Sequence, residues 1–312
     1  MDVMAEPAAH FFHSRRLRLH YVQWGDPQAP VVILLHGGRD HCRNWDGVAR
    51  ELTRDWRVIA PDLRGHGDSD WTSDGQYSFD AYVWDLLSLY EHLGIARADL
   101  VGHSLGGNIT LRFAAMFPEL VRSLVCIEGF FPDPAILEME RGADVVAHAR
   151  QVALQRQRLD RLNPRSHASL EEAVALMKAN NPHLDIALCE HLARHGTRRT
   201  EAGRWVWKFD PCSRKPTQRY FSEEEIMAFA SQVRCPVLLP WGAKSFLVLE
   251  NNRQRIAALA HAHVSVYPNA GHWPHHDDLP RFVSEVRCFL KAAGSEQPLL
   301  PGDGYRFGAA AG

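Results

Sequence analysis

The stretch Gly102-His103-Ser104-Leu105-Gly106-Gly107 decides how this chain folds. It lies between a short apolar run at 98–102 and a segment of helical spacing at 108–117. A sharp strand-to-helix turn of the form Gly-x-Ser-x-Gly strains its serine and exposes the hydroxyl, while the small residues around it relieve crowding. The helix that follows directs free N–H groups and the positive end of its dipole toward this turn. We therefore predict an activated serine at Ser104; the alternative is a glycine-rich turn with an ordinary helix-capping serine.

Buried strands alternate with helices on both sides of this turn. Continuously apolar segments of this kind are typical of parallel strands covered on both faces, and their alternation with helices indicates an α/β fold. The strands are expected at 17–24, 31–35, 57–60, 98–102, 124–127, 236–240 and 264–267, and helices at 79–93, 108–117, 251–260 and 279–292. Polar helical patterns, such as those at 135–161 and 170–178, interrupt the series. We predict a sheet core from 1–131 and 233–293, an inserted helical cap at 132–232 and a flexible tail at 294–312.

Charge and hydropathy exclude several classes of partner. The 312 residues carry 35 Lys and Arg against 37 Asp and Glu, which gives a net charge of −2 and no basic surface for nucleic acid or membranes. No apolar run approaches the ~20 residues of a membrane helix. The first ten residues, MDVMAEPAAH, lack the basic start of a signal peptide. We expect a cytoplasmic enzyme that acts on a small molecule; the sequence leaves its oligomeric state open.

Cysteines and histidines show no metal-binding spacing. The six cysteines lie far apart without a Cys-x-x-Cys pair, so we expect reduced thiols. Among the 18 histidines, the neighbours His261/His263 and His275/His276 do not form an HExxH-like pair. We therefore expect neither a metal site nor a cofactor.

Two further segments complete a site for acyl transfer. His36-Gly37-Gly38 follows the strand at 31–35, and we assign the backbone N–H groups of Gly38 and Leu105 to an oxyanion hole; the alternative is a simple turn at a strand end. His272 lies between the last strand and the last helix, where a general base is expected. We expect the nearby His275 and His276 to be solvated loop residues.

Taken together, these motifs resemble those of the α/β-hydrolase fold family, including its capped members. The resemblance covers residues 11–292 and implies a mostly parallel sheet of the eight-stranded type with helices on both faces. The motifs that carry it are His36-Gly37-Gly38, Asp62-Leu63-Arg64-Gly65-His66-Gly67-Asp68-Ser69, Gly102-His103-Ser104-Leu105-Gly106-Gly107 and Gly271-His272-Trp273-Pro274-His275-His276-Asp277-Asp278. They do not define the substrate.

The chain departs from the family at the acid of the catalytic triad. Relatives often carry this aspartate in a WGxxD segment, whereas here serine stands at its place in Trp241-Gly242-Ala243-Lys244-Ser245. The next acid, Glu250, lies five residues further on. Glu128 ends the strand at 124–127, and certain haloalkane dehalogenases and lactone hydrolases are similar in placing a glutamate there. The resemblance thus implies a triad of Ser104, Glu128 and His272; alternatively, Glu128 caps the entrance to the inserted segment.

The nucleophile limits the chemistry that this resemblance implies. Epoxide hydrolases and haloalkane dehalogenases of this fold have aspartate at the position of Ser104, whereas serine implies an acyl-enzyme from an ester, thioester, lactone, amide or activated C–C bond. We expect a cofactor-independent hydrolase of a small carboxylic ester or lactone. Hydrolysis of a C–C bond in a diketone, and ligand binding with little turnover, are the alternatives.

Aromatic residues are the candidates for substrate binding. Trp205 and Trp207 belong to a segment similar to the WxFDP stretch of some capped relatives, and Phe130, Phe131 and Phe246 belong to the core. These side chains either line a pocket or pack the cap against the core. Arg39 and Arg43 follow the oxyanion loop and either bind a substrate carboxylate or form salt bridges at the surface.

Overall fold

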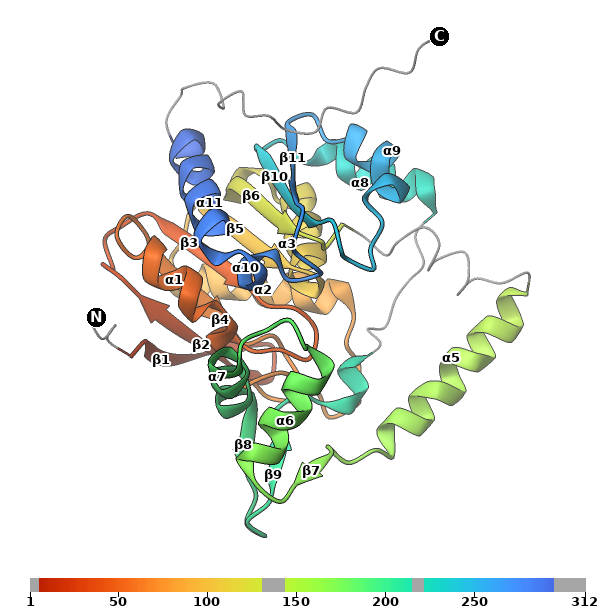
Figure 1. The fold of residues 1–312 in the computed structure, drawn as a ribbon. Coiled ribbons are helices and arrows are strands. Elements are labelled where there is room, and N and C mark those ends of the chain that lie inside the picture. The colour runs from red at the N-terminus through yellow and green to blue at the C-terminus, as the bar shows by residue number, and fades with distance from the viewer. Residues whose placement is uncertain (1–5, 131–143, 215–221, 295–312) are drawn as a thin grey trace.

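One sheet of eight strands forms the centre of the molecule. The computed structural model describes residues 6–130, 144–214 and 222–294. The strand order is β1-β2-β4-β3-β5-β6-β10-β11, with β1, β2 and β4 paired antiparallel and every later pair parallel (Figure 1). These strands are β1 (Ala8–Ser14), β2 (Leu17–Trp24), β3 (Val31–Leu35), β4 (Arg57–Pro61), β5 (Ala98–His103), β6 (Val121–Ile127), β10 (Val237–Gly242) and β11 (Ala262–Tyr267). The predicted α/β fold with a mostly parallel eight-stranded sheet is confirmed.

Helices cover both faces of this sheet and create two apolar cores. Side chains of consecutive β3 residues alternate between them: Ile33 and Leu35 belong to one core, Val32 and Leu34 to the other. The first core includes residues of α2 (Phe79–Leu93), α3 (Leu105–Met116), α8 (Glu223–Gln232) and α9 (Arg253–Ala257). The second includes residues of α1 (Asp46–Leu52) and α11 (Leu279–Gly294). Burial on both faces explains why these strands are continuously apolar in sequence.

Local sequence determines where the helices begin and end. Helix α2 starts after Ser78, whose side chain accepts a hydrogen bond from the Ala81 N–H, and stops at Gly94, which has a φ of 63°. Its bounds are those expected from the sequence. Strand β1 was not predicted, because most of its side chains are exposed and its composition shows no buried alternation. The short helix α1 was not predicted either.

Residues 144–214, between β6 and α8, form a separate layer, whereas α8 at the end of the predicted cap packs in the first core. The elements of this layer are α5 (Val145–Asp160), α6 (Leu170–Asn180), α7 (Ile186–Gly196), η3 (Pro211–Arg214) and a small antiparallel sheet of β7 (Ser166–His167), β9 (Trp205–Trp207) and β8 (Thr197–Arg199). Helices α6 and α7 share their own apolar cluster. Figure 1 shows them below the main sheet, with α5 off to one side. The small sheet was not predicted. Residues 131–143, 215–221 and 295–312, which include the start of the predicted cap and nearly all of the predicted tail, lie outside the described residues.

The glycine-rich motif at 62–69 holds the inserted segment on the core. Gly65 has a φ of 75°, and a Cβ there would lie 2.4 Å from the Tyr77 ring, so only glycine fits. Its carbonyl accepts the Asp210 N–H at 2.8 Å, and the Tyr77 hydroxyl donates to the Asp210 carboxylate at 2.5 Å. Lys208 adds an ion pair with Asp68 at 2.8 Å. This motif therefore attaches the inserted segment through two buried hydrogen bonds and one more exposed ion pair.

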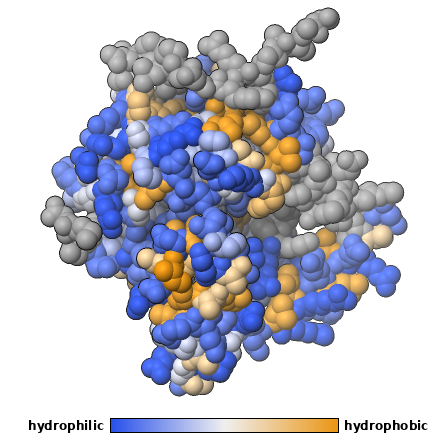
Figure 2. Space-filling model, in the orientation of Figure 1, coloured by the Kyte–Doolittle hydropathy of each residue, from blue (hydrophilic) through white to orange (hydrophobic). Residues whose placement is uncertain are grey.

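The surface is largely hydrophilic. In the view of Figure 2, hydrophobic side chains gather over α6 and α7 and near β10 and β11. Among the described residues, no helix has both the length and the apolar character needed to cross a membrane. All six cysteines are free thiols.

Buried neutral histidines predict a loss of stability in acid. Burial and the neighbouring His36 lower the pKa of His66 to about 3. An unfolded histidine takes up a proton below about pH 6.5, whereas folded His66 stays neutral. Unfolding therefore becomes easier as the pH falls below about 6.5, by up to about 1.4 kcal/mol per pH unit for this residue.

Urea unfolding between about pH 7.5 and 5.5 checks this, because His66→Gln should reduce the slope of the unfolding free energy against pH by an amount that approaches one proton at the acid end. An unchanged slope in a folded His66→Gln variant would contradict the assignment.

Candidate active site

Ser104 occupies a strained turn between β5 and α3. Its φ of 51° and ψ of −110° are unfavourable for a residue with a side chain. Gly102 and Gly106 make the turn possible: a Cβ on Gly102 would lie 2.5 Å from the Gly106 carbonyl oxygen, and one on Gly106 would lie 2.3 Å from that of Leu35. The Ser104 N–H donates to the Ile127 carbonyl at 2.8 Å, which ties the turn to β6. The expected strand-to-helix turn is present.

Strained backbone conformations cluster at the carboxyl ends of the parallel strands. Within the described residues, four non-glycine residues have a positive φ, and three of them follow neighbouring strands: Arg39 after β3, Ser104 after β5 and Glu128 after β6. The fourth, Arg15, lies in the turn between β1 and β2. Ligands of α/β proteins bind at the carboxyl ends of the parallel strands, and strained residues cluster at functional sites. The geometry therefore favours this edge as the active site.

Glu128 and His272 are in direct contact. His272 Nδ1–H donates to Glu128 Oε2 at 2.6 Å, and the carboxylate is 1% exposed. A proton held on Nδ1 leaves the lone pair on Nε2, which is the arrangement of a general base. The contact expected between these two residues from the sequence is thus present.

Two other groups hold the Glu128 carboxylate. The Gly242 N–H donates to Oε1 at 2.6 Å, and the Ser245 hydroxyl donates to Oε2 at 2.5 Å. Ser245 stands where relatives often have the triad aspartate, and here it orients the glutamate instead. This role of Ser245 was not predicted, although a serine in place of the usual aspartate was its signal in the sequence. Hydrogen bonds to an ionised acceptor are about twice as strong as neutral ones, so this carboxylate is firmly oriented.

His103 and the loop after β3 surround the nucleophile. His103 Nε2–H donates to the His272 carbonyl at 2.9 Å, which links the residue before Ser104 to the general base. A Cβ on Gly37 would lie 3.5 Å from Ser104 Cβ. One built on Gly38 would lie 4.0 Å from Leu105 Cδ2. The two residues assigned to the oxyanion hole are therefore neighbours beside Ser104. The contact between His103 and the His272 loop was not predicted from the sequence.

The competing histidines and acids lie elsewhere. His275 is completely buried, stacks on Trp45 at 4.8 Å and donates from Nε2 to Asn44 Oδ1 at 3.2 Å. The expectation that it is a solvated loop residue is wrong, because it lies on the short helix α10 (Pro274–Asp277) and packs in the core. His276 is not a solvated loop residue either: it lies on the same helix, half-buried, with a buried Nε2. Glu250 pairs with Arg253 at the surface.

The substrate-binding candidates are spread over several places. Phe246 is 72% exposed, and its ring lies 4.7 Å from that of His272. Arg39 and Trp207 border a cavity of about 20 Å³ under the inserted segment. The remaining candidates are distributed as follows: Phe130 lies in the core, Trp205 lies in β9, Arg43 pairs with Asp46 at 2.8 Å, and Phe131 is outside the described residues. Phe246 is thus the candidate whose ring contacts that of His272.

Comparison with known proteins identifies the family. A family model described as alpha/beta hydrolase fold matches residues 30–279. The chain belongs to the α/β-hydrolase fold family. Esterase Rv0045c of Mycobacterium tuberculosis is 35% identical over 190 residues, which cover 61% of this chain and 59% of the esterase. A solved structure of that esterase has a TM-score of 0.72 at 27% identity and covers 91% of this chain and 92% of its own.

Two other relatives widen the range of chemistry in the family. Epoxide hydrolase 4 of Mus musculus is 36% identical over 121 residues, or 38% of this chain and 33% of that enzyme. The thioesterase domain from the curacin biosynthetic pathway shares the fold, with a TM-score of 0.77, 22% identity and coverage of 91% of this chain and 100% of the domain. The family match and the two curated relatives support the expectation of an enzyme of the hydrolase class, whereas the curacin domain, at 22% identity, shows the fold alone.

Removing the hydroxyl of Ser245 should lower the rate of hydrolysis without abolishing it. The Ser245→Ala variant leaves Glu128 with two donors, so kcat should fall by about 10- to 150-fold, the equivalent of one hydrogen bond to a charged group. Steady-state ester hydrolysis measures this, with Ser231→Ala on α8 as the matched control. Equal rates for Ser245→Ala and the wild type would contradict the role given to Ser245.

Moving the carboxylate to position 245 should restore activity that is lost at position 128. Glu128→Gly suits the φ of 46° at this position and should lower kcat by about 10³- to 10⁴-fold. Adding Ser245→Asp places a carboxylate where the Ser245 hydroxyl now lies, 2.5 Å from the oxygen that His272 contacts. We expect the double variant to recover at least about tenfold in kcat. A double variant no faster than Glu128→Gly would contradict the assignment of the acid.

Proposed function

We propose that this chain is a cofactor-independent serine hydrolase that cleaves a small carboxylic ester or lactone through an acyl-enzyme at Ser104. The observation that carries the proposal is the 2.6 Å contact between His272 Nδ1 and Glu128 Oε2, at the same sheet edge as the strained Ser104. An imidazole held in this tautomer has its basic nitrogen available to take the proton of a serine hydroxyl.

In the proposed reaction, His272 Nε2 takes the Ser104 Oγ proton as Oγ attacks the substrate carbonyl. The negative charge that develops on the carbonyl oxygen accepts hydrogen bonds from the N–H groups of Gly38 and Leu105. His272 then gives its proton to the leaving alcohol, which stays attached to the acyl group when the substrate is a lactone. Water, activated by the same nitrogen, releases the acid. Glu128 remains ionised and stabilises the imidazolium.

The identity of the nucleophile favours ester over epoxide chemistry. Aspartate is the nucleophile of epoxide hydrolases in this fold, and Ser104 stands at that position. A serine alkoxide attacks an acyl carbon, which suits the activity named for the mycobacterial esterase relative. The residues proposed here require neither a metal nor a cofactor for acyl transfer.

The inserted segment acts in this proposal as a cap over the site. Trp273, the residue after His272, is half-buried and packs against the apolar cluster of α6 and α7. The exposed Phe246 ring beside His272 supplies an apolar wall for the substrate. Trp205, Trp207 and Arg39 are then candidates for contact with the far end of the substrate. The free thiols suit a reducing compartment, so we place the enzyme in the cytoplasm.

Labelling with a fluorophosphonate tests the proposal directly. Intact-protein mass should show one adduct on the wild type, no adduct on Ser104→Ala and slower labelling of Glu128→Gln, because only an activated serine reacts. Ser231→Ala serves as the matched control and should label like the wild type. Labelling that persists in Ser104→Ala would contradict the nucleophile.

A substrate panel then separates the remaining chemistries. Short esters, lactones and diketones are compared by kcat/KM, and we expect the highest value for an ester or a lactone. Turnover of diketones alone would make the chain a C–C hydrolase that uses the same residues. A folded wild type that shows neither an adduct nor turnover would favour the ligand-binding alternative.

A further inference from the structure

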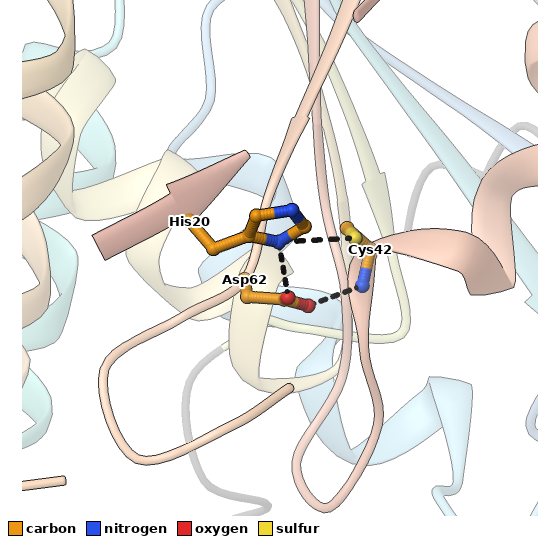
Figure 3. Close-up of side chains that lie close together, drawn as sticks. All are labelled: His20, Cys42 and Asp62. Carbon is orange, nitrogen blue, oxygen red and sulfur yellow. Dashed lines mark hydrogen bonds and ion pairs between the residues drawn. The ribbon is translucent and has the colours of Figure 1, made fainter. Parts of the chain in front are cut away.

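A second cluster of chemically reactive side chains lies outside the proposed active site. His20 belongs to β2, Cys42 begins the short helix η1 (Cys42–Trp45), and Asp62 follows β4. Figure 3 shows the three side chains converging, with the His20 ring nitrogen facing both the Asp62 carboxylate and the Cys42 sulfur. His20 Nδ1 lies 2.7 Å from Asp62 Oδ2 and 3.9 Å from Cys42 Sγ. All three residues are buried.

We propose that His20, Cys42 and Asp62 bind a divalent transition-metal ion, and that Zn²⁺ is the ion that suits them best. One ligand atom from each residue lies within 4.8 Å of the other two. A sulfur, an imidazole nitrogen and a carboxylate oxygen form a typical zinc ligand set, whereas Mg²⁺ and Ca²⁺ prefer oxygen. Zinc distances of about 2.0–2.3 Å require the nitrogen and oxygen to part by about half an ångström and the sulfur to approach slightly.

The backbone already holds these three residues together. Asp62 Oδ1 accepts the Cys42 N–H at 2.7 Å, and Oδ2 accepts the Asp68 N–H at 2.9 Å. The Ser69 hydroxyl accepts the His20 N–H at 2.8 Å and donates to the Asp62 carbonyl at 2.7 Å. Outer hydrogen bonds of this kind orient metal ligands and raise affinity. Only small side-chain movements are therefore needed for an ion to bind.

The charge at the cluster also favours a cation. The Asp62 carboxylate is buried, and among the described residues the His20 imidazole is the side chain that hydrogen-bonds to it. The nearby Lys208 and Arg43 are engaged by other carboxylates, at 2.8 Å from Asp68 and Asp46 respectively. Buried charges are normally paired or bound to a metal.

A cavity beside the cluster leaves room for a further ligand. It measures about 140 Å³, and His20, Cys42, Asp62 and His41 all border it. His41 Nε2–H donates to the Leu192 carbonyl at 3.0 Å, which leaves Nδ1 as an acceptor. That Nδ1 is buried and has no hydrogen-bond partner within the described part of the chain. A water molecule bound to the ion can occupy the fourth coordination position and donate a hydrogen bond to His41 Nδ1. That bond satisfies a buried acceptor, which otherwise costs free energy because it lacks a partner.

Coordination changes the protonation of two ligands. The Cys42 thiol loses its proton to solvent as the metal–sulfur bond forms. The His20 proton moves from Nδ1 to Nε2, so that Nδ1 can bind the ion. Each ion bound therefore releases one net proton.

A second histidine cluster is the strongest competitor. His191 and His195 lie one turn apart on α7, and their nitrogens come close to the Asp46 carboxylate. The Arg43 guanidinium, however, donates two hydrogen bonds to Asp46 Oδ2 and one to Oδ1, and His191 Nε2–H donates to the Arg43 carbonyl at 2.9 Å. A positive guanidinium on the carboxylate opposes a second cation, so the ion belongs at His20, Cys42 and Asp62.

X-ray absorption at the zinc edge tests the site on the unaltered, tag-free chain with one equivalent of Zn²⁺. We expect one sulfur neighbour at about 2.3 Å and nitrogen or oxygen neighbours at about 2.0–2.1 Å. With Co²⁺ as the probe, the wild type should show a thiolate charge-transfer band. That band should be lost in Cys42→Ser and retained in Cys288→Ser, which alters an exposed thiol on α11.

Affinity measurements by chelator competition complete the design. Cys42→Ser and His20→Asn should weaken Zn²⁺ binding by more than about 100-fold, beyond the loss expected from changing an outer hydrogen-bond partner. His191→Ala should bind like the wild type. A zinc shell without sulfur, binding lost in His191→Ala, or no binding at micromolar Zn²⁺ would each overturn the proposal. None of these readouts depends on hydrolytic activity, and the absorption experiment needs no variant that might fail to fold.

Discussion

The structure of the active-site edge depends on one buried carboxylate, which must be hydrogen-bonded by the groups around it. Glu128 is almost completely buried, and an ionised group in that position is tolerated only when donors surround it. Its three donors come from separate places: the end of β10, the loop after β10 and the loop that carries His272. Because β6 lies between β5 and β10, the glutamate at its end is next to the nucleophile on one side and these donors on the other. One charge thus determines how the loops at this edge are arranged.

Gly242 shows how strict this arrangement is. A Cβ at this position would lie 1.8 Å from the Gly271 carbonyl oxygen, so any side chain would push away the loop that carries His272. The same residue supplies a backbone donor to Glu128. Gly242 therefore both allows the loop of His272 to pack closely and donates a hydrogen bond to the Glu128 carboxylate. A serine at position 245 completes that structure, because here the carboxylate follows β6, whereas relatives often carry it after the strand that corresponds to β10.

The sequence predicted the features that are encoded locally. Apolar runs such as 31–35 predict buried strands because two packed faces leave no room for polar residues, and Gly-x-Ser-x-Gly predicts its turn because only glycine fits there. Glu128 was reached by resemblance once Ser245 had replaced the usual aspartate. Features that depend on distant contacts were missed, among them the burial of His275 against Trp45. The cluster of His20, Cys42 and Asp62 joins residues about twenty positions apart, so no spacing pattern signals it.

The two clusters share a scaffold. His36, at the start of the oxyanion loop, accepts the Leu63 N–H on Nε2 at 3.0 Å, and Leu63 follows Asp62 directly. The loop that carries Gly38 is therefore anchored to the same segment that holds the proposed metal ligands. An ion bound there would stiffen the support of the oxyanion loop, which is a structural contribution rather than a chemical step.

The most direct test of the central claim is proton NMR of the His272 Nδ1–H. A hydrogen bond to a buried carboxylate strongly deshields this proton, so the wild type should show a far-downfield resonance. We expect that resonance to be absent from this region in Glu128→Gly and to persist in His275→Gln. A wild type without it, or a Glu128→Gly variant that retains it, would contradict the conclusion that Glu128 holds the general base.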